Sequence, residues 1–439
     1  MEKKIVLVGA ASASFGFPTL TDLFLSKVLT GSTIVLHDIN KNHLEMIYKL
    51  ISAENKLQNN KFRIEYTTER PKAFKDADFI INSIEVGERF KLWKEDYEIP
   101  RSHGSTQILG ECGGPGGTMH AFRIIPSIID IVKDAEKICP NAFFINFSNP
   151  LSRVCLAIKK VTNSLKFIGL CHQIEFLNKH LPVLLGKSLE EIKIKVGGLN
   201  HFAFLLGLEE KETKKDLMPL FNSKALKYFK QNEDRFEFST LTFEVYQRFN
   251  FFPYVGDNHL GEFLQFGEEF TKNQDMIDWI DRTEYEGKLV FEYFRWRFKE
   301  FQKGRFPRKG ILSKFPSKER AIPIIEEIIQ DKAAYEVAVN IPNENIIENL
   351  PQNLILECSA IVSREGVYGV RIGEIPKQIE AILNIEAILQ DLCVEAILKK
   401  SKELAINCLA LDPNVGNFEM AESIFNEMKS KSSYYNYFK

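Results

Sequence analysis

Five short apolar runs without polar alternation lie in the first 170 residues of the chain, at 5–8, 34–36, 79–81, 143–145 and 167–170. Runs of this length are typical of strands that are buried on both faces. Longer stretches with helical spacing of apolar residues separate them, as at 44–51 and 124–132. This alternation predicts an α/β fold with a Rossmann-like, doubly wound parallel sheet.

The pattern changes after about residue 190. Helical spacing dominates there, at 288–301, 379–400 and 420–428. We therefore expect two domains, a dinucleotide-binding domain at 1–192 and a mainly helical α+β domain at 193–439. No low-complexity linker separates them, so they should pack together, and a cleft between domains is the usual place for a ligand site.

Composition excludes several classes of protein. The 439 residues carry 57 basic and 59 acidic side chains, which leaves no global field to hold a nucleic acid. No stretch approaches the roughly 18 apolar residues of a membrane helix. The N-terminal run is interrupted at Gly9, which argues against a secretory signal. Seven scattered cysteines, an odd number, predict reduced thiols, and we expect a cytoplasmic protein that starts at Met1.

The turn after the first predicted strand is a candidate dinucleotide site. Small residues there would let the backbone approach a pyrophosphate at the start of the next helix. Ala11 and Ser14 occupy the second and third glycine positions of the usual G-x-G-x-x-G pattern, so a tight turn without a ligand is the alternative. Asp38, after the second strand, could bind ribose hydroxyls and favours NAD over NADP. The candidate turn residues are Gly9, Ala11, Ser12, Ala13, Ser14 and Phe15.

Two further segments lie next to a predicted helix or strand and could contribute to a ligand site. Five glycines lie within residues 110–117, before a helix expected from about Thr118, and glycines are used where backbone meets a ligand. Glu111 in this loop could act as an acid or base, although a flexible surface loop is the alternative. Asn146 and Asn149 follow the run at 143–145, where ligands of open α/β sheets collect, although Asn-Pro is also a common turn signal.

Cys171 and His201 each follow a predicted strand. A thiolate and an imidazole from separate strand ends can form half of a divalent-metal site. A buried structural thiol with a hydrogen-bonded histidine is one alternative. A dyad with Cys171 as nucleophile and His201 as base is another.

The nine residues from Tyr254 to Glu262 include four ionisable side chains, those of Tyr254, Asp257, His259 and Glu262. Tyr254, Asp257 or His259 could serve as a general base brought across the cleft from the second domain. Alternatively, Asp257 or Asn258 caps a helix.

Taken in order, these segments resemble glycoside hydrolase family 4, the NAD- and divalent-metal-dependent glycosidases. The resemblance spans nearly the whole chain. Its motifs are Gly9-Ala10-Ala11-Ser12, Glu98-Ile99-Pro100 with Gly104 and Gln107, the loop 110–117, Arg123-Ile124-Ile125-Pro126, Asn146-x-x-Asn149-Pro150, Gly169-Leu170-Cys171-His172, Asn200-His201, Asp257-x-His259-x-x-Glu262-Phe263, Asn349-Leu350-Pro351 and Leu411-Asp412-Pro413.

The resemblance implies a lactate/malate dehydrogenase-like fold, bound NAD, and Mn²⁺ or another divalent metal held by Cys171 and His201. It also implies a homodimer or homotetramer that acts on a small sugar. The family has Asp where this chain has Glu111 and Thr where it has Cys112. The sugar-binding candidates are Asn149, His172, Asn200, His259 and Arg89, and Asn82 and Asn146 join the dinucleotide candidates.

The mechanism that the resemblance implies combines redox chemistry with elimination, and the family is an exception among glycosidases in this respect. NAD⁺ oxidises C3 of the sugar, a base removes the C2 proton, the C1 substituent is eliminated, water adds, and the ketone is re-reduced. The base is expected to be Asp257 first and Tyr254 second, with Glu111 at the acid's position.

His172, after the metal cysteine, resembles the branch that acts on unphosphorylated α-glucosides, α-galactosides or α-galacturonides. The sequence identifies no cation for a uronide carboxylate. The main alternative is an NAD-dependent 2-hydroxyacid dehydrogenase, which needs no thiolate metal ligand. A non-catalytic NAD-sensing protein is a second alternative, and it would leave most of these segments without a use.

Overall fold

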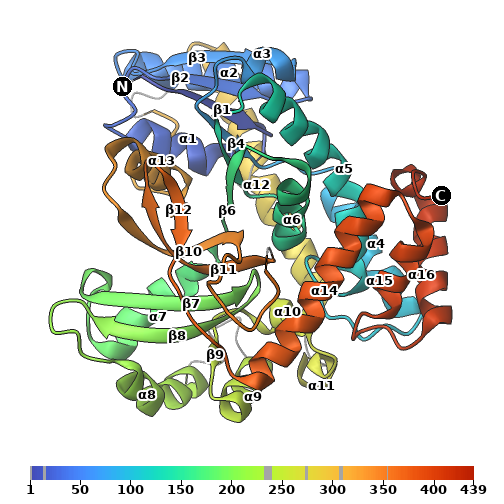
Figure 1. The fold of residues 1–439 in the computed structure, drawn as a ribbon. Coiled ribbons are helices and arrows are strands. Elements are labelled where there is room, and N and C mark those ends of the chain that lie inside the picture. Colours follow the sequence, from blue (N-terminus) through green and yellow to red (C-terminus); the bar gives the residue numbers. More distant parts are fainter. Residues whose placement is uncertain (1, 13–15, 232–239, 272–274, 306–309, 353) are drawn as a thin grey trace.

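The computed structural model describes residues 2–12, 16–231, 240–271, 275–305, 310–352 and 354–439 (Figure 1). The five apolar runs form five of the parallel strands in its first half. The strands there are β1 (Lys4–Val8), β2 (Thr33–His37), β3 (Arg63–Thr67), β4 (Phe79–Asn82), β5 (Phe143–Asn146) and β6 (Lys166–Gly169). They pair in parallel in the order β3-β2-β1-β4-β5-β6. The predicted Rossmann-like fold is confirmed.

Helices cover both faces of this parallel sheet. Along β1, Ile5 and Leu7 belong to one hydrophobic cluster, whereas Val6 and Val8 belong to another on the opposite face. Both faces are therefore buried, which explains why the strand sequences do not alternate. The helices of this half are α1 (Gly16–Leu25), α2 (Lys41–Leu57), α3 (Arg70–Phe74), α4 (Arg89–Ser102), α5 (Gly114–Ile138), α6 (Leu151–Val161) and α7 (Glu175–Leu185).

The sheet continues without a break into the second half of the chain. β10 pairs antiparallel with β6, and the order runs on as β10-β11-β7-β8-β9, with β12 beside β11. The second-half strands are β7 (Ile192–Leu199), β8 (Phe202–Glu210), β9 (Phe252–Pro253), β10 (Ala334–Pro342), β11 (Ile355–Ser363) and β12 (Gly366–Gly369). The division into 1–192 and 193–439 therefore crosses one mixed sheet, and it stays a prediction.

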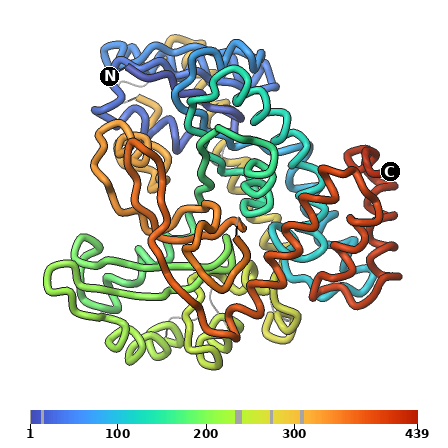
Figure 2. The backbone as a smooth tube through the Cα atoms, in the orientation of Figure 1, coloured from blue at the N-terminus to red at the C-terminus, as the bar shows by residue number. Residues whose placement is uncertain are grey.

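The last helices return to the first half. In Figures 1 and 2 the C-terminal segment, drawn in red, lies beside the cyan and teal part of the chain, and α14 packs against α5 and α6. The second-half helices are α8 (Met218–Gln231), α9 (Thr240–Phe249), α10 (Asp257–Leu260), α11 (Gly267–Thr271), α12 (Met276–Gln302), α13 (Ala321–Gln330), α14 (Lys377–Lys399), α15 (Lys402–Ala410) and α16 (Phe418–Lys431). Within the described ranges, no helix combines the length and apolarity needed to cross a membrane.

Helix α5 begins at Gly114, four residues before the expected start at Thr118, so the prediction of the start was wrong. Three of the glycines assigned to a loop, Gly114, Gly116 and Gly117, lie in the first turn of the helix, and the last two serve close packing. A β-carbon at Gly117 would lie 2.5 Å from the carbonyl carbon of Cys112, and one at Gly116 would collide with the carbonyl oxygen of Asp96. These glycines let the helix start pack closely against backbone.

Candidate active site

Polar side chains meet where β4 and β5 end side by side. The Nδ2 of Asn82 donates to Asn146 Oδ1 at 2.9 Å and to Ser148 Oγ at 3.2 Å, and Asn146 Nδ2 donates to the Ser148 carbonyl at 3.0 Å. The Oδ1 of Asn82 is buried and has no hydrogen-bond partner among the described residues. The carboxyl edge of a parallel sheet is where ligands of this fold bind. The structure therefore brings two predicted dinucleotide residues together at that edge.

The described part of the turn after β1, residues 9–12, packs closely against neighbouring backbone. Gly9 has a φ of +79°, and a β-carbon there would lie 2.8 Å from the carbonyl oxygen of Ser83. Asp38 accepts the Ala11 backbone N–H at 3.0 Å, which fixes this turn against the end of β2. The turn leads into α1, whose N-terminus can face a pyrophosphate. Ala13, Ser14 and Phe15 lie outside the described residues, and Ser12 belongs to the described turn.

The predicted metal ligands are adjacent. Cys171 follows β6, His201 lies in the turn between β7 and β8, and Cys171 Sγ is 3.4 Å from His201 Nε2. Burial raises the pKa of the Cys171 thiol and lowers the pKa of the His201 imidazole. Both groups are therefore neutral near pH 7 before a cation binds. The buried Nδ1 of His201 has no partner among the described residues, so it is an available ligand atom.

Further donors surround His201. Ligand atoms of Glu111, His201 and His259 lie within 4.8 Å of one another, as do those of Cys112, His201 and Glu262. The rings of His201 and His259 have centroids 4.1 Å apart. Thiol, imidazole and carboxylate groups are ligands for divalent transition metals. The donor set around His201 therefore fits a divalent cation.

Glu111 is held beside this group by residues from three separate segments. Its Oε1 accepts from the Arg89 guanidinium at 3.0 Å and from Asn149 Nδ2 at 3.3 Å. Its Oε2 is 3.9 Å from His259 Nδ1. Arg89 starts α4, Asn149 follows β5, and His259 lies in α10. The fold thus gathers four of the predicted catalytic and sugar-binding residues.

Glu262 has a role that the sequence analysis missed. Its fully buried carboxylate accepts the backbone N–H groups of Glu111, Cys112 and Gly113, the last two at 3.2 and 3.3 Å. These groups precede a 25-residue helix whose N-cap, Gly113, has no capping side chain. A carboxylate satisfies such N–H groups and the positive helix end. A glycine loop before a long helix without its own cap is the signal that could have pointed to a distant carboxylate.

Glu357 is the second residue that the sequence analysis missed. This buried side chain on β11 accepts from Tyr254 Oη at 2.6 Å, Asn200 Nδ2 at 2.7 Å and Asn340 Nδ2 at 3.1 Å. Burial raises the pKa of Glu357, and burial together with this carboxylate raises that of Tyr254. Two predicted site residues, Tyr254 and Asn200, thus bind a common buried carboxylate. Its signal was a lone charge within the apolar segment 354–362.

Asp257 makes well-defined contacts with another helix. Its carboxylate accepts the Thr242 N–H at 2.9 Å, the Thr242 hydroxyl at 2.7 Å and the Leu241 N–H at 3.2 Å. It therefore caps α9, whereas the N-cap of its own helix α10 is Gly256. The assignment of Asp257 as the base stays a prediction.

His172 follows Cys171 directly, and its side chain is 65% exposed. Its Nδ1 lies 3.9 Å from Glu319 Oε1, a carboxyl whose pKa burial raises to about 7. Its assignment to the sugar site stays a prediction.

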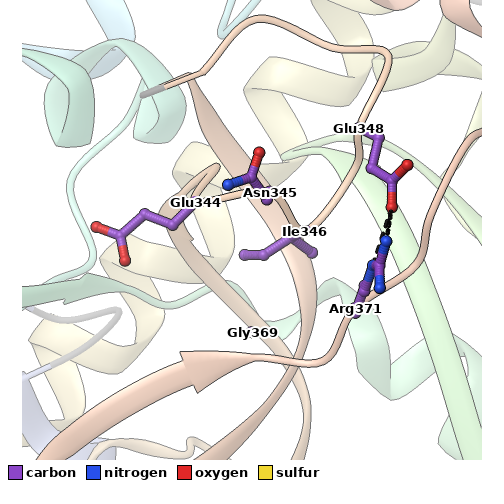
Figure 3. A pocket seen from close by; sticks show the side chains of 6 residues that line it. All are labelled: Glu344, Asn345, Ile346, Glu348, Gly369 and Arg371. Atoms are coloured by element: carbon purple, nitrogen blue, oxygen red, sulfur yellow. Dashed lines mark hydrogen bonds and ion pairs between the residues drawn. The ribbon is translucent and has the colours of Figure 1, made fainter.

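A cavity next to Glu111 is lined by charged groups that are already paired. Arg123 makes two hydrogen bonds to Asp96, and His120 Nε2 lies 3.3 Å from Glu85. Burial opposes ionisation of Glu85, but His120 lowers its pKa to about 2; burial likewise opposes protonation of His120, but Glu85 raises the pKa of this imidazole. A separate surface hollow contains none of the predicted site residues; it is lined by Glu344, Asn345, Ile346, Glu348, Gly369 and Arg371 (Figure 3).

Comparison with known families identifies the class of this protein. Two family models match it, "Family 4 glycosyl hydrolase" over residues 4–186 and "Family 4 glycosyl hydrolase C-terminal domain" over 196–415. An α-glucosidase from Erwinia rhapontici is 35% identical, with 94% of each chain covered. An α-galacturonidase from Thermoanaerobacter italicus is 28% identical, with 97% of this chain and 95% of the relative covered. The chain belongs to glycosyl hydrolase family 4, as the motifs predicted.

Solved structures agree with this fold. A 6-phospho-α-glucosidase from gut microorganisms, in complex with NAD and Mn²⁺, has a TM-score of 0.86 at 21% identity, with 98% of each chain covered. Lactate dehydrogenase from Eimeria maxima, with NADH and oxamate, has a TM-score of 0.53 at 14% identity, with 91% of this chain and 98% of that chain covered. The expected dehydrogenase-like architecture is confirmed, and this likeness concerns the fold alone.

Proposed function

We propose that this family 4 hydrolase cleaves unphosphorylated α-glycosides, α-glucosides first, using NAD and Mn²⁺. The observation that carries the proposal is the position of His201, which contacts Cys171 and also shares a group of possible metal ligands with Glu111 and His259. The turn at Gly9 and Asp38 follows strands of the same sheet. The family 4 neighbour that binds NAD and Mn²⁺ supports both cofactors.

The proposed sugar is neutral because the cations near Glu111 already have partners. Arg89 pairs with Glu111, Arg123 with Asp96 and His120 with Glu85. A uronide or a sugar phosphate would need a cation without such a partner, and both Arg123 and His120 are held by carboxylates. The 35% identity to an α-glucosidase supports a glucoside in particular.

Bound NAD⁺ would supply a hydride acceptor, and a bound divalent cation would supply a Lewis acid beside the sugar hydroxyls. Cys171 and His201 would hold the cation, and Asn149 would orient the sugar. Arg89 and Asn149 both bind Oε1 of Glu111 and leave Oε2 free of these two residues. We propose that Oε2 carries the proton that is transferred to the glycosidic oxygen. In this proposal, cleavage proceeds by C3 oxidation, C2 deprotonation, elimination, water addition and re-reduction.

Asp257 is proposed as the base that removes the C2 proton. Its rival Tyr254 donates its phenolic proton to Glu357, and burial raises the pKa of this phenol, so it stays protonated near pH 7. A base role for Asp257 requires its carboxylate to leave the cap of α9 in the complex with sugar.

A panel of 4-nitrophenyl α-glucoside, α-galactoside, α-galacturonide and α-glucoside 6-phosphate tests the proposal. The α-glucoside should be hydrolysed fastest, only with NAD⁺, Mn²⁺ and a thiol reductant all present, and without net NADH. Hydrolysis without NAD⁺ would contradict the proposed mechanism. Stoichiometric NADH release from a 2-hydroxyacid would favour the dehydrogenase alternative. A faster rate on the uronide or the phosphate would overturn the neutral-sugar assignment.

A further inference from the structure

Glu319 is a mostly buried acid that the proposed reaction leaves unused. Its side chain is 13% exposed, and its carboxylate accepts no hydrogen bond within the part of the chain that the structure describes. The ion pair that it makes is a long one, with His172 Nδ1 at 3.9 Å, which exceeds hydrogen-bonding distance. A buried acceptor without a donor costs free energy, and a ligand hydroxyl removes that cost. Glu319 is therefore available to a ligand.

The backbone on both sides of Glu319 is fixed by other elements. Ser317 donates its backbone N–H to Asp22 of α1 at 2.7 Å, and the Glu319 N–H donates to Ser317 Oγ at 3.0 Å. On the other side, Arg320 Nε donates to Glu336 of β10 at 3.0 Å. A side chain that binds substrate needs a supporting structure of this kind to hold its position.

A row of side chains joins the acid of the proposed reaction to Glu319. Its members, in order, are Glu111, His259, His201, Cys171, His172 and Glu319. Glu111 is at one end of this row, Glu319 is at the other, and the proposed metal ligands Cys171 and His201 lie between them. Glu319 belongs to neither group of possible metal ligands around His201, so its role differs from theirs.

The order of carbon atoms in a pyranose ring matches this row. In the proposed reaction, Glu111 serves the glycosidic oxygen on C1. Cys171 and His201 hold a cation beside the hydroxyls of C2 and C3, the two carbons that react. C4 follows C3 in the ring, so its hydroxyl lies beyond the metal ligands as seen from Glu111. Glu319 lies at that end of the row.

We propose that Glu319 binds the 4-hydroxyl group of the sugar whose C1 bond is cleaved. The carboxylate accepts a hydrogen bond from this hydroxyl, and the imidazole of His172 lies close enough to contact the same oxygen. The 4-hydroxyl is equatorial in glucosides and axial in galactosides, so a carboxylate fixed in this way favours glucosides. This inference rests on the proposed function and deepens it, because it names the residue that recognises C4.

Hydrolysis of 4-nitrophenyl α-glucoside and of its 4-deoxy analogue tests the contact. Glu319→Ala should lower kcat/KM for the α-glucoside by about 10- to 100-fold, the usual loss when a hydrogen bond to a charged group is removed. Its preference for the α-glucoside over the α-galactoside should fall as well. For the 4-deoxy analogue, kcat/KM should equal that of the wild type, because no hydroxyl is present to bind. An equal loss on the α-glucoside and its 4-deoxy analogue would overturn the proposal.

The matched control is Glu175→Ala, which removes a neighbouring carboxylate that pairs with Lys318 at 3.2 Å. This variant should keep the wild-type ratio of kcat/KM between the α-glucoside and its 4-deoxy analogue. The same change of ratio in Glu175→Ala as in Glu319→Ala would indicate a general effect of charge and contradict the contact. If Glu319→Ala does not fold, Glu319→Gln should show the same contrast with a loss of about tenfold, because a neutral acceptor binds more weakly.

Equilibrium binding separates this inference from the proposed function, because binding needs no turnover. Calorimetric titration in the presence of NAD⁺ and Mn²⁺ compares glucose with 4-deoxyglucose. The wild-type protein should bind glucose at least about tenfold more tightly, whereas Glu319→Ala should bind the two sugars equally. A wild-type protein with this binding preference but no hydrolysis of α-glucosides would contradict the proposed function and support the contact. Equal binding of the two sugars by the wild-type protein would overturn the contact.

Discussion

The two sides of the candidate site differ in how their polar atoms are satisfied. On the glycine-loop side, Glu262 accepts three consecutive backbone N–H groups and is fully buried. On the other side, Cys171 and His201 are kept neutral by burial, and His201 Nδ1 has no partner among the described residues. A buried polar group is normally paired. The carboxylate on the glycine-loop side is therefore satisfied by contacts within the fold, whereas the imidazole on the other side keeps a nitrogen that is available to a ligand.

Removal of the thiol should have the largest effect. Cys171→Ser should lower the Mn²⁺-dependent rate of hydrolysis by more than about 100-fold, because the hydroxyl is a poor substitute for a thiolate ligand. NAD⁺ binding and the melting temperature should change little. The control Cys139→Ser, at the far end of α5, should keep full activity. A Cys171→Ser protein that does not fold would instead show that the thiol is structural.

The next largest effect concerns the base. Asp257→Asn should lower kcat by about 100-fold, the usual contribution of a general base, and should abolish exchange of the C2 proton with solvent. Tyr254→Phe should retain that exchange, because the phenol serves as a donor to Glu357. Exchange lost in Tyr254→Phe but kept in Asp257→Asn would reverse the assignment and leave Asp257 as the cap of α9 only.

Glu262→Gln should act on stability. The amide retains one acceptor oxygen but leaves N–H groups of the loop unpaired, so the free energy of unfolding should fall by about 1–3 kcal/mol. Urea unfolding measures this change. The control Glu268→Gln removes a half-exposed pair with Arg101 and should cost less than about 1 kcal/mol. Equal losses in both variants would contradict the special role of the loop carboxylate.

The smallest effect is the pH dependence of metal binding. In the protein without metal, the thiol pKa is raised above its usual value near 9 and the imidazole pKa is lowered below 6.5. Between these values the thiol alone must lose a proton when the cation binds, so affinity for Mn²⁺ should rise about tenfold per pH unit. Isothermal titration calorimetry at several pH values measures the slope. A flat wild-type profile, equal to that of Cys171→Ser, would exclude the thiolate as a ligand.

Local pattern predicted most of the parallel sheet. Strands β1, β2, β4, β5 and β6 have central residues that are largely buried on both faces, so each contains a continuous apolar run that is easily recognised. The strand β3 was not predicted, because it lies at the sheet edge with mostly exposed polar residues, and such a segment lacks the signal. The start of α5 was placed too late, because glycines that allow close packing look the same in a sequence as glycines in a loop.

For the site, the sequence identified residues that follow strands but not their partners. Cys171 and His201 each follow a strand, and the topology of a doubly wound sheet places such positions on one edge. Glu262 contacts a loop about 150 residues earlier in the chain, and Glu357 joins Tyr254 and Asn200 from a strand that the pattern did not reveal. Contacts of that sequence separation depend on the packing of β11 and of the short 3-10 turn Gly261–Phe263, which no local pattern contains.

The most direct test of the redox and elimination mechanism is the isotope content of the product formed in D₂O. The wild-type enzyme should hydrolyse 4-nitrophenyl α-glucoside in the presence of NAD⁺ and Mn²⁺ to glucose that carries deuterium at C2. Mass spectrometry and proton NMR locate the label. Glucose formed at the same rate without deuterium at C2 would contradict the account, because the C2 proton would then never have left the sugar.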